Sequence, residues 1–280
     1  MPALRQPRPV AASARLATAL ADASAPYQYV DPPQHQRGEA QLAEETALAI
    51  AFNGISQAVM MVSPADLEDF VVGFALGNGV IDTIDDIYDI RLDGTGAARQ
   101  VQVEISNRAF WRLKRQRRQL AGTSGCGLCG VEALEQALPS LPVLSAAPLP
   151  PSEWLHDLRQ RIAAWQTLGG HCGAVHAALF MDGQGELRLA REDIGRHNAL
   201  DKLIGALLRQ RLPRDDGLAI VTSRCSLELI HKALRAGIHT LVSLSAPTGL
   251  AVQWARRHRL NLIHLPQRSA PRVYSPELRP

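Results

Sequence analysis

The spacing of apolar and polar positions divides the chain into two halves with different rhythms. In the first half, two short apolar runs flank Asn53-Gly54, a dipeptide typical of a two-residue hairpin turn. A helix is predicted to follow, with Ser63 as its N-cap and Pro64 at its first position. A second strand pair and a basic helix come next. The expected strands are 46–52, 57–62, 87–92 and 101–105, and the expected helices are 63 to about 77, 107–120 and 131–138.

In the second half, helical and strand periodicities alternate with short connections, which predicts a sheet with parallel strands covered by helices. Ligands gather at the carboxyl ends of such strands. The loops there contain small hydroxyl residues and arginine, which favours a phosphate or nucleotide, although plain N-capping by Ser226 and Thr248 explains those hydroxyls equally well. The expected helices are 152–166, 197–211, 226–236 and 248–259, and the expected strands are 175–181, 187–190, 218–222, 240–244 and 260–265.

Four segments follow from these patterns. Residues 1–40, rich in Ala, Pro and Arg, are expected to be a disordered tail. Residues 41–138 are expected to form a smaller α+β domain that contains a paired-cysteine loop near its end. The stretch 139–151 contains five prolines and is interpreted as a linker. Residues 152–280 are expected to form the larger α/β domain.

Composition narrows the setting of these domains. A chain of 280 residues with 46% apolar composition can bury a substantial core. Four cysteines are too few for a disulfide scaffold and indicate a reducing compartment, so we expect a cytoplasmic protein. No apolar run approaches the roughly 20 residues that span a bilayer, and no secretory segment is recognised, so no membrane partner is expected. The net charge of +3 does not by itself imply a nucleic-acid partner.

The densest chemistry lies in Cys126-Gly-Leu-Cys129, where two sulfurs can meet on one side of a glycine-rich turn. A helix directly after such a thiol would lower its pKa, because the helix dipole stabilises the thiolate. Sulfur transfer is one interpretation. The alternative is a non-catalytic zinc-binding or nucleotide-binding module, with further metal ligands from Cys172, His171 or Cys225, although only one tight cysteine pair exists.

The basic stretch 107–120 leads toward these cysteines and contains six Arg or Lys residues and no acid. A solvated helix face explains it, and so does a surface that docks a partner or steers a phosphate. A second charged stretch, 191–202, packs acids, Arg, His, Asn and Lys around Gly195 at a strand exit, which indicates a polar site.

In that stretch, Glu192-Asp-Ile-Gly-Arg-His-Asn-Ala-Leu-Asp-Lys-Leu-Ile-Gly205 closely resembles the EDVGRHNALDKLIG block of the formate dehydrogenase accessory protein family. The resemblance covers nearly the whole of the chain expected to be ordered. Further matches follow in order at Asp66–Phe74, Cys126–Gly130, Gly173–Ala178, Ser223–Ser226, Lys232–Ile238, Ser243–Val252 and Val273-Tyr274.

The resemblance implies a cytoplasmic sulfur carrier, hence a sulfurtransferase. Members accept sulfur from a cysteine desulfurase as a persulfide and pass it to the molybdenum cofactor, a bis-molybdopterin guanine dinucleotide, for formate dehydrogenase. It also implies a C-terminal cytidine-deaminase-like mixed sheet covered by helices, and a homodimer. Cys126 is assigned the persulfide by the family match and Cys129 the helper role, but the sequence does not rank the two. Cys172 and Cys225 are interpreted as buried small residues.

By the same resemblance, the cofactor is bound as a substrate, and no permanently bound metal is expected. A nucleobase deaminase is disfavoured, because His176-Ala-Ala178 lacks the glutamate that shuttles protons beside the zinc of those enzymes. The family's Gly-Arg step after the last strand is missing, so Arg268 or Arg272 must serve, and either His171 or His176 can face the ligand. The expected cofactor-binding residues are His176, Arg196, His197, Arg224, Leu265, Pro266, Gln267, Arg268, Ser269 and Ala270.

Overall fold

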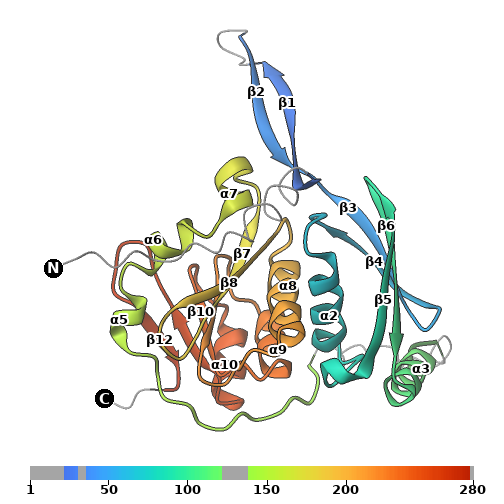
Figure 1. Cartoon of the computed structure of the whole chain (residues 1–280). Coiled ribbons are helices and arrows are strands. Elements are labelled where there is room, and N and C mark those ends of the chain that lie inside the picture. Colours follow the sequence, from blue (N-terminus) through green and yellow to red (C-terminus); the bar gives the residue numbers. More distant parts are fainter. Residues whose placement is uncertain (1–21, 31–35, 122–137, 278–280) are drawn as a thin grey trace.

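A computed structural model of the chain describes residues 22–30, 36–121 and 138–277 (Figure 1). The described strands form three sheets, ordered β1-β2, β4-β3-β6-β5 and β12-β11-β10-β9-β7-β8. Helices α2 (Leu67–Gly77) and α8 (Arg196–Arg209) lie side by side between the two larger sheets (Figure 1). The expected mixture of helices and sheets is confirmed.

The N-terminal sheet follows the predicted hairpin closely. β3 (Thr46–Phe52) and β4 (Ile55–Val62) pair antiparallel. The turn residues Asn53 and Gly54 have φ of 46° and 77°, the left-handed backbone that a tight hairpin requires. β5 (Ile87–Thr95) and β6 (Ala98–Ile105) form the second pair and are longer than expected.

The predicted start of the first long helix is wrong. α2 begins at Leu67, after Asp66 in a left-handed conformation, and Ser63 is not its N-cap. Instead, the backbone N–H of Ser63 donates to an oxygen of Asp193 at 3.0 Å, and its hydroxyl accepts from the backbone N–H of Ile194 at 3.1 Å. Ser63 is therefore bound to the C-terminal half of the chain, which removes it from the helix end.

The basic helix is confirmed as α3 (Asn107–Ala121), which follows a single 3₁₀ turn, η1 (Ile84–Asp86), and the strands β5 and β6. Leu113 is buried on its inner side, as its spacing predicts. Cys126, Cys129 and the helix predicted over 131–138, except its last residue, lie outside the described residues.

The expected disordered tail is wrong for its second half. β1 (Ser24–Val30) and β2 (Arg37–Ala43) pair antiparallel along their whole length in a hairpin that projects from the rest of the molecule (Figure 1). Tyr29 lies opposite Gly38, and its ring covers the space where a side chain of Gly38 would stand. The prediction relied on the average composition of the first forty residues, which gives little weight to two strand-forming tyrosines, Tyr27 and Tyr29.

The C-terminal sheet is mixed, as expected. β9 (Leu218–Val221), β10 (Thr240–Ser243) and β11 (Asn261–His264) run parallel, and β7 (His176–Met181) pairs antiparallel with β9. β8 (Leu187–Asp193) extends the sheet beyond β7. The other edge is β12 (Arg272–Ser275), which no periodicity predicted.

The helices cover both faces of this sheet. α8, α9 (Leu227–Arg235) and α10 (Gly249–Arg257) contribute to the core that includes the N-terminal sheet. The prediction of a single helix over 152–166 is wrong. It is divided into α5 (Ser152–Leu155) and α6 (Leu158–Ala163) at Asp157, whose φ of 50° breaks the helix.

Two segments interpreted as irregular are tightly bound. α7 (Thr167–Cys172) forms from the Gly-Gly-His-Cys run, because the Glu192 carboxylate accepts from the free backbone N–H groups of Leu168 and Gly169 at 2.7 and 2.9 Å. The proline-rich stretch 139–151 is extended and is held to the C-terminal sheet by Asn261, whose amide donates to the carbonyls of Ala147 and Pro148. This segment is therefore bound to the C-terminal sheet and is not a free linker.

Candidate functional site

The sheet topology brings the predicted cofactor residues to one edge. β7 runs antiparallel to β9, so His176 at its start lies beside Arg224, which follows the end of β9. Arg196 and His197 open α8 just after β8 ends. The stretch 265–270 follows β11 and belongs to the same carboxyl edge, with β10 between.

Hydrogen bonds fix the loops of this edge to one another. The hydroxyl of Thr222 accepts from the backbone N–H of Ala177 at 3.0 Å. The hydroxyl of Ser243 lies 2.9 Å from the carbonyl oxygen of Ser223 and 2.6 Å from that of Ser245. The hydroxyl-rich loops found in the sequence thus join neighbouring strand ends, and Thr248 caps α10 by accepting from the N–H of Ala251.

His176 is the imidazole that faces the guanidinium groups. Burial lowers its pKa below the usual value of 6.5, and the nearby charges of Arg196 and Arg224 lower it further. His176 is therefore held neutral beside two cations. His171 is exposed on α7, where its Nδ1 lies 2.7 Å from the carbonyl oxygen of Thr167. Of these two histidines, only His176 belongs to the edge.

His197 lies at the junction of α8 and α9. Its Nε2 is 3.4 Å from the Ser226 hydroxyl and 3.1 Å from the Glu228 carboxylate. Burial lowers the pKa of His197, and Glu228 acts in the opposite direction. His197 therefore joins two helix starts at the edge, where an imidazole can donate to or accept from a bound polar group.

Arg159 is a residue that sequence reasoning missed. From α6 it reaches across two strand ends, and one terminal nitrogen donates to the carbonyls of Leu244 at 2.6 Å and Leu265 at 2.5 Å. Leu265 begins the predicted cofactor stretch, so Arg159 sets where that stretch leaves the sheet. No sequence motif includes Arg159. The sequence predicted only that it lies in the helix 152–166, before the strand 175–181.

His264 is buried at the end of β11 and stacks on Tyr274 of β12. Burial lowers its pKa, and Arg272 and Arg159 lower it further. Two arginines could replace the missing Gly-Arg step, and both are exposed: Arg268 lies between β11 and β12, and Arg272 is the first residue of β12.

Three buried nitrogens lie near this edge without a hydrogen-bond partner among the described residues: Nε of Arg196, Nε of Arg159 and Nδ1 of His264. Similar atoms occur away from the edge, in Arg99, Arg112, His231 and His239. At the edge, these nitrogens accompany the guanidinium groups that lower the pKa of His176 and His264. This donor set suits an anionic, phosphate-bearing ligand.

The charged stretch 191–202 contains two groups of residues in different environments rather than one polar site. Asp193 and Lys202 form an ion pair at 2.6 Å, and both side chains have 0% exposure. The Lys202 ammonium also donates to the carbonyl of Ser63 at 3.0 Å, and the Asn198 amide donates to that of Met61 at 2.9 Å. The interpretation as a ligand site is therefore wrong for Asp193, Asn198 and Lys202, which join the two halves of the fold.

A second buried pair extends this junction. Lys232 of α9 donates to both oxygens of Asp201 at 2.9 and 2.8 Å. Burial raises the pKa of Asp201 to about 6 despite the neighbouring ammonium. Close by, Gly73 and Gly205 let α2 and α8 touch, since a Cβ on either would lie 1.8 Å from a backbone carbonyl oxygen of the other helix.

The two described cysteines differ. Cys225 is buried, as expected, and burial raises its thiol pKa to about 12, so it is a poor thiolate. Cys172 is only half-buried, and its thiol donates to the carbonyl of Leu168 at 3.1 Å. Within the described residues, no group of three or more His, Cys, Asp or Glu side chains could hold a metal ion. Cys126 and Cys129 lie outside that search.

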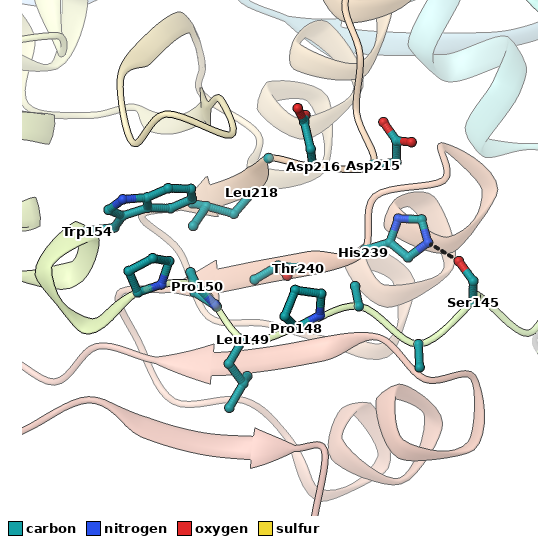
Figure 2. Close-up of a pocket in the computed structure, with 14 residues that line it drawn as sticks. Ser145, Pro148, Leu149, Pro150, Trp154, Asp215, Asp216, Leu218, His239 and Thr240 are labelled. Atoms are coloured by element: carbon teal, nitrogen blue, oxygen red, sulfur yellow. Dashed lines mark hydrogen bonds between the residues drawn. The ribbon is translucent and has the colours of Figure 1, made fainter.

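A cavity of about 400 Å³ opens at the opposite edge of the sheet, where β9 and β10 begin. The indole of Trp154 and the rings of Pro148 and Pro150 form one side, and Asp215 and Asp216 lie across from them (Figure 2). None of the predicted cofactor residues lines it. The cavity and the candidate site are therefore separate. Among the described helices, none is both long and apolar enough to cross a bilayer.

Comparison with known proteins gives one consistent result. The sequence model of the FdhD/NarQ family matches residues 43–280. A protein of Bordetella petrii named "Sulfur carrier protein FdhD" is 44% identical over 235 residues, which is 84% of each chain. A protein of the same name from Cupriavidus necator is 43% identical and covers 88% of this chain and 90% of its own. The crystal structure of a putative formate dehydrogenase accessory protein from Desulfotalea psychrophila has the same fold, with a TM-score of 0.68 and 24% identity over 90% of this chain and 95% of its own.

Proposed function

The chain belongs to the FdhD/NarQ family, and from that premise we propose that it carries sulfur for the maturation of a formate dehydrogenase. The names of its relatives support the sulfur-carrier role. The observation that supports a cofactor as the recipient is the carboxyl edge, where the charges of Arg196 and Arg224 act on the neutral imidazole of His176.

We propose that Cys126 takes the sulfur from a cysteine desulfurase. Its thiolate attacks the outer sulfur of the donor's cysteine persulfide, the donor's S–S bond breaks, and the donor cysteine leaves as a thiolate. Cys126 then carries a persulfide, and no external oxidant is consumed. The glycines on each side of the cysteine pair support this role, because they leave both sulfurs open to a partner.

In the delivery step, the Cys129 thiolate attacks the inner sulfur of the Cys126 persulfide. A Cys126–Cys129 disulfide forms, and the outer sulfur leaves as hydrosulfide. On the bound cofactor this sulfide would replace an oxygen ligand, which would leave as water. A dithiol reductant then restores the two thiols. Either cysteine could occupy either role in this scheme, and the family match assigns the persulfide to Cys126.

The recipient is proposed to be the molybdenum cofactor in its bis-molybdopterin guanine dinucleotide form, bound as a substrate. Arg196 and Arg224 would contact its phosphates, and neutral His176 could donate one hydrogen bond without adding charge. The stretch 265–270, held at Leu265 by Arg159, would contact a guanine end. We also propose, from the family resemblance, a cytidine-deaminase-like C-terminal half, a homodimer and a cytoplasmic location.

Mass spectrometry of the full chain after incubation with a cysteine desulfurase and cysteine tests the loading step. We expect one added sulfur on the peptide that contains Cys126 and Cys129, removed by dithiothreitol. Cys126→Ala should abolish it, and Cys225→Ala is the matched control, because that buried thiol should not load. Sulfur on another peptide, or none at all, would refute the proposal.

A further inference from the structure

One outward face of α3 combines an exposed aromatic ring with cations that form no ion pair within the described residues. Trp111, Lys114 and Arg115 are three and four positions apart, which places them on the same side of the helix. The side chain of Trp111 is 61% exposed. The Lys114 ammonium lies 5.1 Å from the centre of its ring and 4.3 Å from that of Phe110. We call these three residues the Trp111 face.

The arginines that flank the Trp111 face already have partners. Arg108 pairs with Asp86 at 3.2 Å, and Arg112 pairs with Asp82 at 2.5 Å and donates to the carbonyl of Val80 at 2.9 Å. Leu113 is buried beneath the helix. These contacts fix α3 to the segment 80–86 and to the core beneath it, so the Trp111 face is not required to hold the helix in place.

Within the described part of the chain, neither Lys114 nor Arg115 forms an ion pair. Lys114 and Arg115 lie in the middle of α3, outside its last turn, so the helix dipole gives them little stabilisation. The dipole does not explain an indole left in water among them. An aromatic anchor beside basic residues is typical of protein interfaces, where Trp and Arg contribute most of the binding energy.

The position of the face relative to the cysteines indicates which partner it would meet. Cys126 follows the last residue of α3, Ala121, by five positions, and a chain of that length spans at most about 18 Å. Trp111 is ten residues, about 15 Å, from the end of α3, so Cys126 lies at most about 33 Å from the Trp111 face. A protein that covers α3 could therefore present a reactive sulfur to Cys126.

We propose that the Trp111 face docks the sulfur-donating protein through an acidic surface patch on that protein that contains an apolar pocket for the indole. This rests on the proposed function, because it assigns the loading partner to a surface of the same chain. Opposite charges would raise the rate of encounter, and the indole would extend the lifetime of the complex.

The test measures binding of a purified bacterial cysteine desulfurase to the full chain by isothermal titration calorimetry at low and high salt. Lys114→Glu with Arg115→Glu should weaken binding about tenfold or more at low salt and flatten its salt dependence. Trp111→Ala should weaken it about tenfold with the salt dependence retained. The matched control is Arg257→Glu with Arg259→Glu, which reverses two exposed charges on and after α10 and should change affinity less than twofold.

Several results would overturn the docking proposal: no binding by the unaltered chain, equal losses in both reversal pairs, or no loss in either. Tighter binding of a DNA oligonucleotide or an anionic vesicle to the same face would also overturn it, by assigning another partner. Persulfide formation is measured in parallel. If binding depends on the Trp111 face but no sulfur is transferred, the proposed function fails while the docking surface stands. If sulfur is transferred equally to the charge-reversed chain at low desulfurase concentration, the docking surface fails alone.

Discussion

Two groups of charged residues come from neighbouring positions of one sequence block, yet they have opposite environments. Asp193 and Lys202 are fully buried, paired with each other and bonded to the N-terminal half. Arg196 and His197 are half-buried, and the Nε of Arg196 has no partner. The buried group has its hydrogen bonds satisfied within the protein, whereas the edge group keeps donors available. Dense charge in a sequence therefore occurs both at a buried junction and at a candidate ligand site, and the two are distinguished by burial.

The largest effect is expected at the buried junction. Lys202→Met would leave the Asp193 carboxylate buried without its ion pair, so the free energy of unfolding should fall by about 3–5 kcal/mol. Urea denaturation measures this loss. Replacing the pair together, with Lys202→Met and Asp193→Leu, should recover part of it, because no lone charge remains. A single variant as stable as the unaltered chain would contradict the structural role of the pair.

Substitutions at the carboxyl edge should weaken ligand binding while leaving the stability of the fold nearly unchanged. Arg196→Gln with Arg224→Gln should change the free energy of unfolding by less than about 1 kcal/mol. The same double variant should weaken binding of guanosine diphosphate, used as a probe for one end of the cofactor, about tenfold or more. Calorimetry measures this, and Arg188→Gln is a control at an exposed arginine that pairs with Asp182 outside the edge. Unchanged affinity in the double variant would move the ligand elsewhere.

Arg159 shares features with both groups. It is half-buried, and it holds the start of the stretch 265–270. Arg159→Met should raise amide hydrogen exchange in that stretch and weaken guanosine diphosphate binding about fivefold, because the stretch loses its fixed exit from the sheet. Arg159→Lys should rescue part of the affinity. Weaker binding without any change in exchange would contradict a positioning role.

The smallest effect concerns pH. The pKa of His176 in the free protein is below 6.5, because of burial and the two guanidinium groups. A bound phosphate would offset those cations and raise this pKa, so the complex would bind a proton that the free protein releases. Protonation of His176 in the complex should therefore increase the affinity for guanosine diphosphate as pH falls below about 6.5.

NMR titration of the His176 ring with and without the nucleotide measures this shift directly. His176→Gln is the control that removes the imidazole while leaving the titration of the nucleotide's own phosphate. A His176 pKa that is unchanged or lowered on binding would contradict the placement of a phosphate beside it.

The fold was largely readable from the sequence, and its errors have local causes. Apolar periodicity predicted both large sheets, α2, α3 and α8, because those elements bury one regular face. It missed the division of helix 152–166, because the left-handed conformation of Asp157 leaves no mark on periodicity. It missed the β1–β2 hairpin, because the average composition of the first forty residues concealed two tyrosines.

The candidate site was less readable, because it is assembled by contacts between distant segments. The sequence placed His176, Arg196 and Arg224 near strand ends, and the mixed sheet explains why they lie at one edge, because β7 starts where β8 and β9 end. It did not separate Asp193 from Arg196, three positions apart, because burial depends on what Ser63 and Met61 bring from the other half. Arg159 was unreadable for the same reason, since its partners are backbone carbonyls far along the chain.

The central claim is that one chain loads sulfur at its cysteine pair and delivers it to a cofactor held at the carboxyl edge. The direct test is a single-turnover transfer, in which the chain is preloaded with radiolabelled persulfide sulfur, freed of desulfurase and of reductant, and mixed with the bis-molybdopterin guanine dinucleotide cofactor. We expect the unaltered chain to transfer label to the cofactor, and Arg196→Gln with Arg224→Gln to load normally but transfer at least about tenfold more slowly at subsaturating cofactor. Equal transfer rates for the two chains would contradict the account.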